Sequence, residues 1–253
     1  MLDFNGQVVL VTGAGSPRGI GRVIAHTFAR QGATVVICDI NKAGVDANVK
    51  EMQELGFADV YGAEVNLSKQ ESVDALVADV VARYGRIDVL VNNAGLCRKT
   101  TVPEMDMDEA RMILEVNVFG LMMMSKAVCN TMKEQNYGRI VHISSLAGKR
   151  GGGFFGGPHY SASKGAVLAF SKNLARDVVK YGITSNCVCP GLTNTDMWGT
   201  LNEDQVNDIL AMVPMGRPGN PQEIADTVVF LASKEASYIT GEDIDVNGGA
   251  HMD

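Results

Sequence analysis

The chain has 253 residues, of which 46% are hydrophobic and 20% are charged, and its formal net charge is −7. This length suits one large α/β domain with a buried sheet. Because no linker-like, low-complexity or repeated segment divides the chain, we expect a single domain over residues 1–253. The acidic balance argues against a nucleic-acid partner and against adhesion to anionic lipid.

Targeting and metal signals are weak in this sequence. The apolar runs fall short of the ~20 residues that span a bilayer, and Asp3 lies where a signal peptide would carry positive charge. We therefore expect a soluble, cytoplasmic enzyme. The five cysteines are odd in number and form no C-x-x-C pair, and the four histidines show no ligand spacing, so we expect free thiols and no metal.

Apolar, strand-like runs alternate with helical patterns along the whole chain. Strands are predicted at Gln7–Thr12, Thr34–Asp39, Val60–Glu64, Val89–Asn92, Arg139–Ile143, Thr184–Cys189 and Asp243–Asn247. Helices are predicted at Ile20–Gln31, Ala43–Leu55, Lys69–Tyr84, Met107–Glu134, His159–Lys180 and Pro221–Leu231. This alternation predicts an α/β fold with a doubly wound parallel sheet of about seven strands and helices on both faces. Ligands of such sheets bind beyond the carboxyl ends of the strands.

A glycine-rich loop follows the first predicted strand and precedes a helix. Gly13, Gly19 and Gly21 would let the backbone turn tightly and approach a pyrophosphate, which the helix N-terminus would also attract. An ordinary glycine-rich turn is the alternative, but the position between strand and helix favours a dinucleotide site.

The second predicted strand ends at Asp39, which bears on the choice of dinucleotide. A carboxylate there can accept hydrogen bonds from both ribose hydroxyls. It would repel a 2′-phosphate by about 4 kcal/mol at ~4 Å and an effective dielectric of ~20. Arg18 is the opposing evidence, because a guanidinium in the glycine loop could pair with that phosphate. We predict that NAD is preferred over NADP.

Tyr160 and Lys164 are four residues apart, on one face of a predicted helix. A free phenol ionises near pH ~10, and a fixed ammonium close by favours the phenolate. The pair therefore predicts a general acid and base, Tyr160, whose pKa is lowered by Lys164. The same spacing also occurs by chance in many helices, so the rest of the chain has to support this interpretation.

Taken together, the motifs resemble the short-chain dehydrogenase/reductase family over essentially the whole chain. The resemblance is carried by the glycine loop, by Asn92-Asn93-Ala94-Gly95, Asn117, Ser145, Tyr160, Lys164 and Pro190-Gly191, and by Val246-Asn247-Gly248-Gly249. It implies a Rossmann-type fold, hydride transfer with NAD(P) and, in most members, a tetramer. The cofactor half would span about residues 1–140, and the catalytic and substrate-binding half about 141–253.

The sequence departs from the family pattern in three places. The glycine loop has two extra residues between Gly13 and Gly19, and Asn66 replaces the usual aspartate beside the adenine. An amide can still donate and accept there. The segment between Ser145 and Tyr160 is about two residues longer than usual and rich in glycine.

The resemblance assigns roles to residues by position. It implies that Tyr160 is the proton donor in ketone reduction, that Lys164 also holds the nicotinamide ribose, and that Ser145 rather than Ser144 binds the substrate oxygen, since neighbours on an extended strand point oppositely. Asn117 is either a core amide closing a helix hydrogen bond or the holder of a water that links Lys164 to solvent. The expected catalytic set is Asn117, Ser145, Tyr160 and Lys164. The expected cofactor contacts are Gly13, Arg18, Gly19, Ile20, Gly21, Asp39, Asn66, Leu67, Asn93, Ala94, Gly95, Tyr160, Lys164, Pro190, Gly191, Thr193 and Thr195, with Asn92 also facing the adenine ribose.

Substrate selectivity is expected in three loops, Leu96–Thr101, Lys149–His159 and Leu192 to about Met215. The last could form a lid or a short helical hairpin. The pocket candidates are Ser145, Arg150, Phe155, His159 and Trp198. For Lys149 and Arg150 the alternative is an exposed turn, and for His159 a solvent-facing helix start.

The substrate is not identified by these residues. We favour a small polar secondary alcohol such as a polyol or sugar derivative, because NAD preference suits oxidation. A 3-oxoacyl thioester reductase is the first alternative, with Lys149 and Arg150 binding the phosphate of a carrier. A steroid or other bulky ketone comes next, and a dinucleotide-binding sensor without chemistry is the non-enzymatic alternative. The apolar outer faces of Met107–Glu134 and His159–Lys180 predict contact with a second subunit, in line with the homotetramer that the family resemblance implies.

Overall fold

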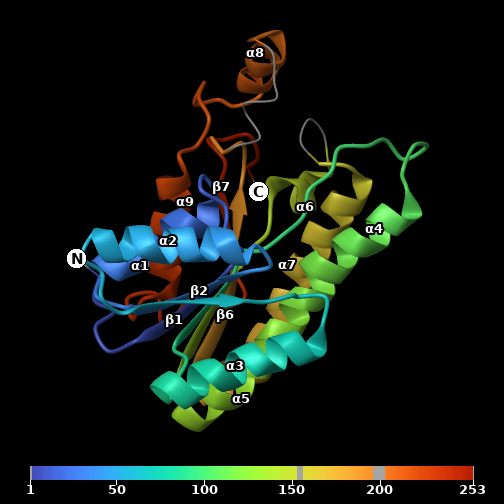
Figure 1. Ribbon diagram of the computed structural model, residues 1–253. Coiled ribbons are helices and arrows are strands. Elements are labelled where there is room, and N and C mark those ends of the chain that lie inside the picture. Colours follow the sequence, from blue (N-terminus) through green and yellow to red (C-terminus); the bar gives the residue numbers. More distant parts are fainter. Residues whose placement is uncertain (1, 153–155, 196–202, 253) are drawn as a thin grey trace.

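A seven-stranded parallel sheet forms the middle of the protein (Figure 1). The computed structural model describes residues 2–152, 156–195 and 203–252. The strand order is β3-β2-β1-β4-β5-β6-β7, so the winding direction reverses between β1 and β4. The strands are β1 (Val8–Thr12), β2 (Thr34–Asp39), β3 (Val60–Glu64), β4 (Val89–Asn92), β5 (Gly138–Ile143), β6 (Ile183–Pro190) and β7 (Asp243–Val246).

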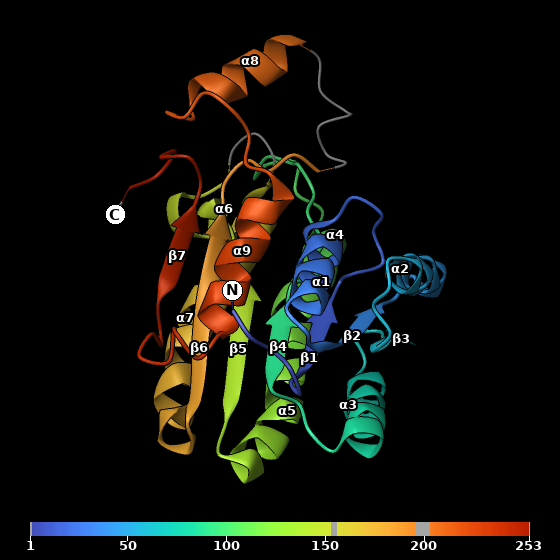
Figure 2. The same cartoon turned by 90° about the vertical axis from the view of Figure 1, so that its left-hand side faces the viewer.

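Helices cover both faces of this sheet, as the alternating pattern predicts (Figure 2). Alternate residues of β1 serve the two faces: Val9 and Val11 pack in one apolar core, and Val8 and Leu10 in the other. The first core is closed by α1 (Ile20–Arg30), α2 (Lys42–Glu54) and α9 (Pro221–Ala232), and the second by α3 (Gln70–Tyr84), α5 (Leu121–Gln135) and α7 (Pro158–Val178).

The long predicted helix over 107–134 is interrupted in the structure. It consists of α4 (Met107–Leu114), a π-helical turn η1 (Glu115–Gly120) and α5. By length and composition the stretch Met107–Gln135 could cross a membrane, but half of its most apolar window is buried inside the protein, as in a core helix. A π-turn within an α-helix often marks a functional site.

The structure differs from the prediction mainly in short elements. The helix α6 (Leu146–Arg150), directly after β5, was not predicted. The helix α8 (Glu203–Ala211) lies in the segment for which a lid or a short helical hairpin was expected. The helix predicted to end at Lys180 ends at Val178 and continues as a 3-10 turn, η2 (Val179–Tyr181). The remaining boundaries agree or differ by one residue, which is within the usual fraying range.

Candidate active site

A cleft of about 1000 Å³ lies at the carboxyl ends of the strands. The loops after β1 to β6 all contribute to it, on both sides of the reversal between β1 and β4. It brings together most of the residues predicted from the sequence: Gly13, Arg18, Gly19, Ile20, Asp39, Asn66, Leu67, Asn93, Ala94, Gly95, Ser145, Arg150, Tyr160, Lys164, Pro190, Gly191, Thr193 and Thr195.

The glycine loop is locked to the loop after β4. The Asn93 amide donates to the carbonyls of Thr12 and Gly13, at 2.9 and 3.0 Å. Gly13 has φ +70°, and a Cβ there would lie 2.6 Å from the Cα of Ala94. Gly21 is buried behind this junction, where a Cβ would lie 2.4 Å from the Asn93 amide nitrogen, and it does not line the cleft. This glycine therefore serves close packing, and its contact with a cofactor stays a prediction.

The N-terminus of α1 opens into the cleft without a side-chain cap, since its N-cap residue is Gly19. Uncapped N–H groups and the positive end of the helix dipole suit a pyrophosphate. At the end of β2, Asp39 is held by two backbone donors at 3.0 Å each, Gly15 N–H to Oδ2 and Asn41 N–H to Oδ1. These features fit a dinucleotide, with the carboxylate at its adenosine end.

The side chains of Asn66 and Asn92 lie in different places, and only that of Asn66 lies at the cleft. The Asn66 carbonyl oxygen accepts from the backbone and hydroxyl of Ser68, so it shapes the turn before α3 while lining the cleft. Asn92 is 3% exposed, and its side-chain amide donates to the Ser125 hydroxyl of α5, 3.0 Å away. It therefore lies between the sheet and α5. The prediction that Asn92 faces the cleft is wrong, because β4 is still extended there and turns its side chain into the core.

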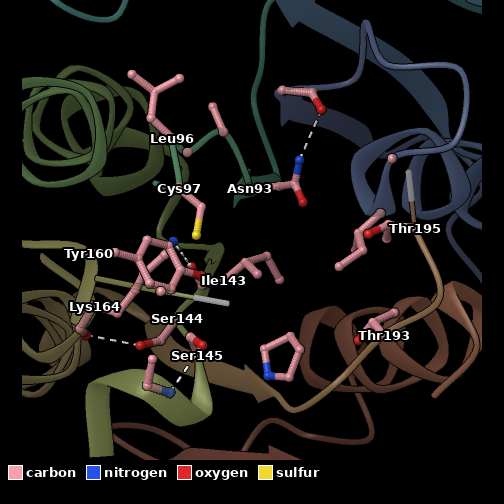
Figure 3. Close-up of a pocket in the computed structure, with 18 of the residues that line it drawn as sticks. Asn93, Leu96, Cys97, Ile143, Ser144, Ser145, Tyr160, Lys164, Thr193 and Thr195 are labelled. Carbon is pink, nitrogen blue, oxygen red and sulfur yellow. Dashed lines mark hydrogen bonds between the residues drawn. The ribbon is translucent and has the colours of Figure 1, made fainter. Parts of the chain in front are cut away.

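The two serines after β5 point in opposite directions. The Ser144 hydroxyl is buried and donates to the Lys164 carbonyl at 2.9 Å. Ser145 is the N-cap of α6 and accepts from the Ala147 N–H at 3.1 Å, and its hydroxyl also bonds with Tyr160. Figure 3 shows Ser145, Tyr160 and Cys97 gathered at one end of the cleft.

Tyr160 and Lys164 lie one turn apart on α7. The Lys164 ammonium donates to the Ile143 carbonyl at 2.7 Å and lies 5.8 Å from the centre of the Tyr160 ring. Gly95 packs beside it, where a Cβ would lie 3.4 Å from Nζ. A side chain at this position would therefore contact the ammonium and the Asn117 oxygen directly.

Burial dominates the protonation of both groups. It raises the pKa of Tyr160 to about 12, with a further increase from the Cys97 thiol and a decrease from the Ser145 hydroxyl. It lowers the pKa of Lys164 to about 8, against smaller increases from Cys187, Cys97 and Cys189. The predicted lowering of the Tyr160 pKa by Lys164 is therefore wrong for the protein groups alone, because desolvation disfavours the phenolate more strongly.

Asn117 lies in the π-turn behind the cleft rather than in its wall. Its Oδ1 accepts from the Leu96 N–H at 2.7 Å, and its Nδ2 donates to the Leu96 carbonyl at 2.9 Å and to the Ser163 hydroxyl at 3.0 Å. The amide thus holds the loop after β4 against α7 and closes no hydrogen bond of its own helix. Its role toward a water near Lys164 stays a prediction.

On the substrate side, the structure corrects two expectations. His159 does not line the cleft: its side chain is 1% exposed and faces Glu109 on α4, because successive helix residues point in different directions. Lys149 is neither exposed nor directed at a substrate, since its ammonium pairs with Asp245 of β7 at 2.9 Å. Arg150 lines the cleft and donates to the Ala250 carbonyl at 3.0 Å. Phe155 and Trp198 lie outside the described residues.

Some apolar residues of the cleft, such as Ile20, Leu67 and Ala94, were predicted from the sequence as cofactor contacts. Others were predicted only through the loops that carry them, or were not predicted. Leu96 and Cys97 come from the predicted loop after β4, and Met212 from the segment after α8. Further apolar side chains also line the cleft, among them Met112, Val116, Ile143, Leu146 and Val213. Within the described ranges, no group of three or more His, Cys, Asp or Glu residues could hold a metal ion. None of the five cysteines, all of which are described, is in a disulfide bond.

Comparison with known proteins now decides the family. A family model described as enoyl-(acyl carrier protein) reductase matches residues 13–251. This chain belongs to the short-chain dehydrogenase/reductase family. As in that family, the α/β fold with its doubly wound parallel sheet is confirmed.

Several relatives and one solved structure match this dehydrogenase/reductase over nearly its whole length. It is 42% identical to the 3-oxoacyl-(acyl-carrier-protein) reductase FabG of Escherichia coli K12 over 99% of this chain and 100% of that protein. The FabG proteins of Salmonella typhimurium (99% and 100% covered) and Thermotoga maritima (98% and 99%) are 43% and 39% identical. A crystal structure of gox2181 superposes with a TM-score of 0.94 at 31% identity, covering 98% and 96% of the two chains.

Family membership implies an oxidoreductase that exchanges a hydride between a nicotinamide dinucleotide and a keto or hydroxyl group. The uncapped start of α1, the fixed Asp39 carboxylate and the Lys164 ammonium are the features of this chain that fit such a cofactor. When bound, the dinucleotide supplies the hydride and the positive charge of its oxidised ring. The protein supplies orientation and the proton.

Proposed function

We propose that this protein reduces the 3-keto group of 3-oxoacyl thioesters to a hydroxyl group. The observation that carries the proposal is the full-length identity of about 40% to relatives named 3-oxoacyl-(acyl-carrier-protein) reductases. The lining of the cleft supports it as well. Leu96, Ile143 and Leu146 offer apolar contacts that suit an acyl chain.

The proposed chemistry uses the three polar groups at the end of the cleft. A hydride reaches the keto carbon while the Tyr160 hydroxyl transfers its proton to the keto oxygen, which gives the alcohol with all charges balanced. Ser145, the N-cap residue of α6, donates to the same oxygen and fixes its position. The positive charge of the Lys164 ammonium stabilises the Tyr160 phenolate that forms.

Few described side chains bear on which carrier group holds the thioester. Lys149 is committed to Asp245, so it does not support the expected pair of basic residues that would bind a carrier phosphate. Arg150 remains at the cleft with one guanidinium nitrogen on the Ala250 carbonyl. A phosphopantetheine carrier protein and coenzyme A share the thioester chemistry, and substrates of both kinds belong in the assay.

Oxidation of a small polar secondary alcohol is the second candidate, and Asp39 is the observation that favours it. Its carboxylate is fixed by Gly15 and Asn41 at the cleft, where a 2′-phosphate would meet it. We propose NAD(H) as the preferred cofactor on this basis, with Arg18 as the residue that would admit NADP(H).

The substrate test compares 3-oxoacyl thioesters with polyols, sugar alcohols and bulky ketones, using NADH and NADPH for reduction and NAD and NADP for oxidation. We expect the highest kcat/KM with 3-oxoacyl thioesters. Tyr160→Phe is the control, because it keeps the ring and loses the acid, and such groups contribute about 10²–10⁴-fold. Faster turnover of polyols would favour the second candidate, and dinucleotide binding with no turnover on any compound would favour a sensor.

The cofactor test measures kcat/KM with both reduced dinucleotides in the unmodified protein and in Asp39→Ala. We expect the unmodified protein to favour NADH and the variant to lose about tenfold or more of that preference, because the repulsion of about 4 kcal/mol disappears. Arg18→Ala is the matched variant on the opposite side, and it should weaken only the NADPH reaction. Faster turnover of NADPH by the unmodified protein would overturn the NAD assignment.

A further inference from the structure

A buried histidine lies directly before the proposed proton donor and has no place in the chemistry above. His159 is in the first turn of α7, and its Nδ1 accepts the Tyr160 N–H at 2.8 Å. That N–H is one of the donors that a helix N-terminus leaves without a partner. Because Nδ1 accepts, the neutral ring carries its proton on Nε2.

The other ring nitrogen faces a carboxylate on a different helix. Nε2 has no hydrogen-bond partner within the described part of the chain, and it lies 3.5 Å from Oε2 of Glu109 on α4. The second oxygen of Glu109 lies 3.4 Å from the Arg98 guanidinium, which belongs to the loop after β4. Glu109 therefore lies between the start of α7 and the loop that carries Cys97.

The loop and the helix start are also joined directly. The Gly157 N–H donates to the Arg98 carbonyl at 2.8 Å. A Cβ at Gly157 would lie 2.9 Å from the His159 ring and 3.0 Å from the Thr100 methyl, so the segments pack without room for a side chain. The position of His159 thus depends on the loop and on α4 together.

We propose that His159 and Glu109 are positioning residues that set the Tyr160 hydroxyl against Ser145 and hold the loop after β4 as the facing wall of the cleft. This inference rests on the proposed role of Tyr160 as proton donor. His159 fixes the backbone of Tyr160 through Nδ1. The Glu109 carboxylate, 3.5 Å from Nε2, attracts the positive edge of the His159 ring and orients it without a hydrogen bond. A misplacement of ~1 Å at a reacting group can cost about 10²-fold in rate.

The test replaces each nitrogen separately. The side-chain oxygen of His159→Asn takes the place of Nδ1, and the amide nitrogen of His159→Gln takes that of Nε2, whereas His159→Leu removes both. We expect kcat for ketone reduction to fall about 100-fold in the Leu variant and about 10-fold in each amide variant, with the dinucleotide KM changed less than about twofold. Glu109→Gln should add little to the loss already present in His159→Asn.

His26→Leu is the matched control, since His26 is also buried in a helix and bonded to one side chain, Asn48 at 2.9 Å. It should lower Tm without changing kcat. A Leu variant of His159 with nearly unchanged kcat would overturn the proposal. So would a loss of dinucleotide binding equal to the loss of kcat, because that would indicate general unfolding.

A second readout does not depend on any substrate. Nitrogen-15 NMR of labelled histidine reports which ring nitrogen carries the proton, and we expect the Nε2–H form of His159 in the unmodified protein. A Nδ1–H form would contradict the proposal. If 3-oxoacyl thioesters are not substrates but the Nε2–H form is found and kcat responds on another ketone, the proposed substrate fails and the positioning role stands.

Discussion

At the scale of single residues, burial acts in opposite directions on the two ionisable groups of the cleft. Tyr160 keeps its proton more firmly, with a pKa of about 12, while Lys164 gives its proton up more easily, with a pKa of about 8. The protein groups alone therefore favour a protonated phenol beside a cation that titrates just above neutral pH. This state suits proton donation to a ketone.

Lys164 predicts the pH dependence of reduction. As pH rises through about 8, Lys164 loses its charge and no longer stabilises the phenolate left after proton transfer, so kcat/KM should fall. Lys164→Arg keeps its charge at these pH values and should lack this decline, although its activity will be lower. The measurement is kcat/KM against pH for both proteins, and a flat wild-type profile across pH 8 would contradict the assignment.

A substitution at Gly156 tests how sensitive the reaction is to the position of the Tyr160 ring. A Cβ at Gly156 would lie 2.4 Å from Cδ1 of that ring, so Gly156→Ala must displace the phenol. We expect kcat to fall about 10- to 100-fold with dinucleotide binding unchanged. Gly219→Ala is the control, because its nearest contact would be 3.5 Å away. Equal kcat in the two variants would show that the ring tolerates the shift.

Some residues of the cleft could be predicted from the sequence, and others could not, for reasons of direction and distance. The position of Ser145, one residue after Ser144, follows from the alternation of an extended strand. His159 was misplaced because its neighbour in sequence, Tyr160, points elsewhere around the helix. Lys149 was misplaced because its partner, Asp245, is close only in the folded chain.

At the scale of elements, the strands were predicted well because several of them, such as β1 and β4, are continuous apolar runs. The interruption of the long helix was not predicted. Nothing in the local pattern of Glu115–Gly120 signals a π-turn. The structure gives its context: Asn117 is committed to Leu96, and Gly120 lies where a Cβ would be 2.8 Å from Leu67. Both contacts join segments far apart in sequence. α6, with five residues, was too short to show a period.

A buried histidine at the centre of the sheet should make the stability of the protein sensitive to acid. His142 of β5 is fully buried, with Nδ1 3.1 Å from the Asn92 amide and Nε2 3.2 Å from the Ser185 hydroxyl. Burial lowers its pKa to about 3, with a smaller contribution from the Lys164 charge. As pH falls below the usual value of about 6.5, the unfolded chain binds a proton that the native protein excludes, so stability declines down to about pH 3.

Urea unfolding at several pH values measures this effect. The wild-type free energy of unfolding should fall by up to about 1.4 kcal/mol per pH unit from His142 alone. His142→Gln should be less stable at neutral pH but lose less stability on acidification. The comparison isolates His142 from His26, whose pKa burial also lowers. Identical pH slopes in the two proteins would contradict the prediction.

At the scale of the whole molecule, apolar side chains remain exposed on one surface. Met107 and Phe119, on α4 and η1, are each 53% exposed. A hollow of about 430 Å³ lies beside Phe119, with Met122 and Met123 in its wall. The predicted homotetramer would cover this surface. We expect sedimentation velocity to show a tetramer at micromolar concentration, and Phe119→Glu to weaken it. A clean monomer would contradict the prediction.

The parallel sheet also has a consequence for how the protein regains its structure. Each strand pair joins segments separated by a crossover, and β1 meets β4 across about 80 residues, with Val9 beside Val89. Such long-range pairing slows folding and favours partly formed intermediates. Because the cleft draws on loops from both sides of that β1–β4 seam, recovery of enzymatic turnover after dilution from denaturant should lag behind recovery of helical circular dichroism.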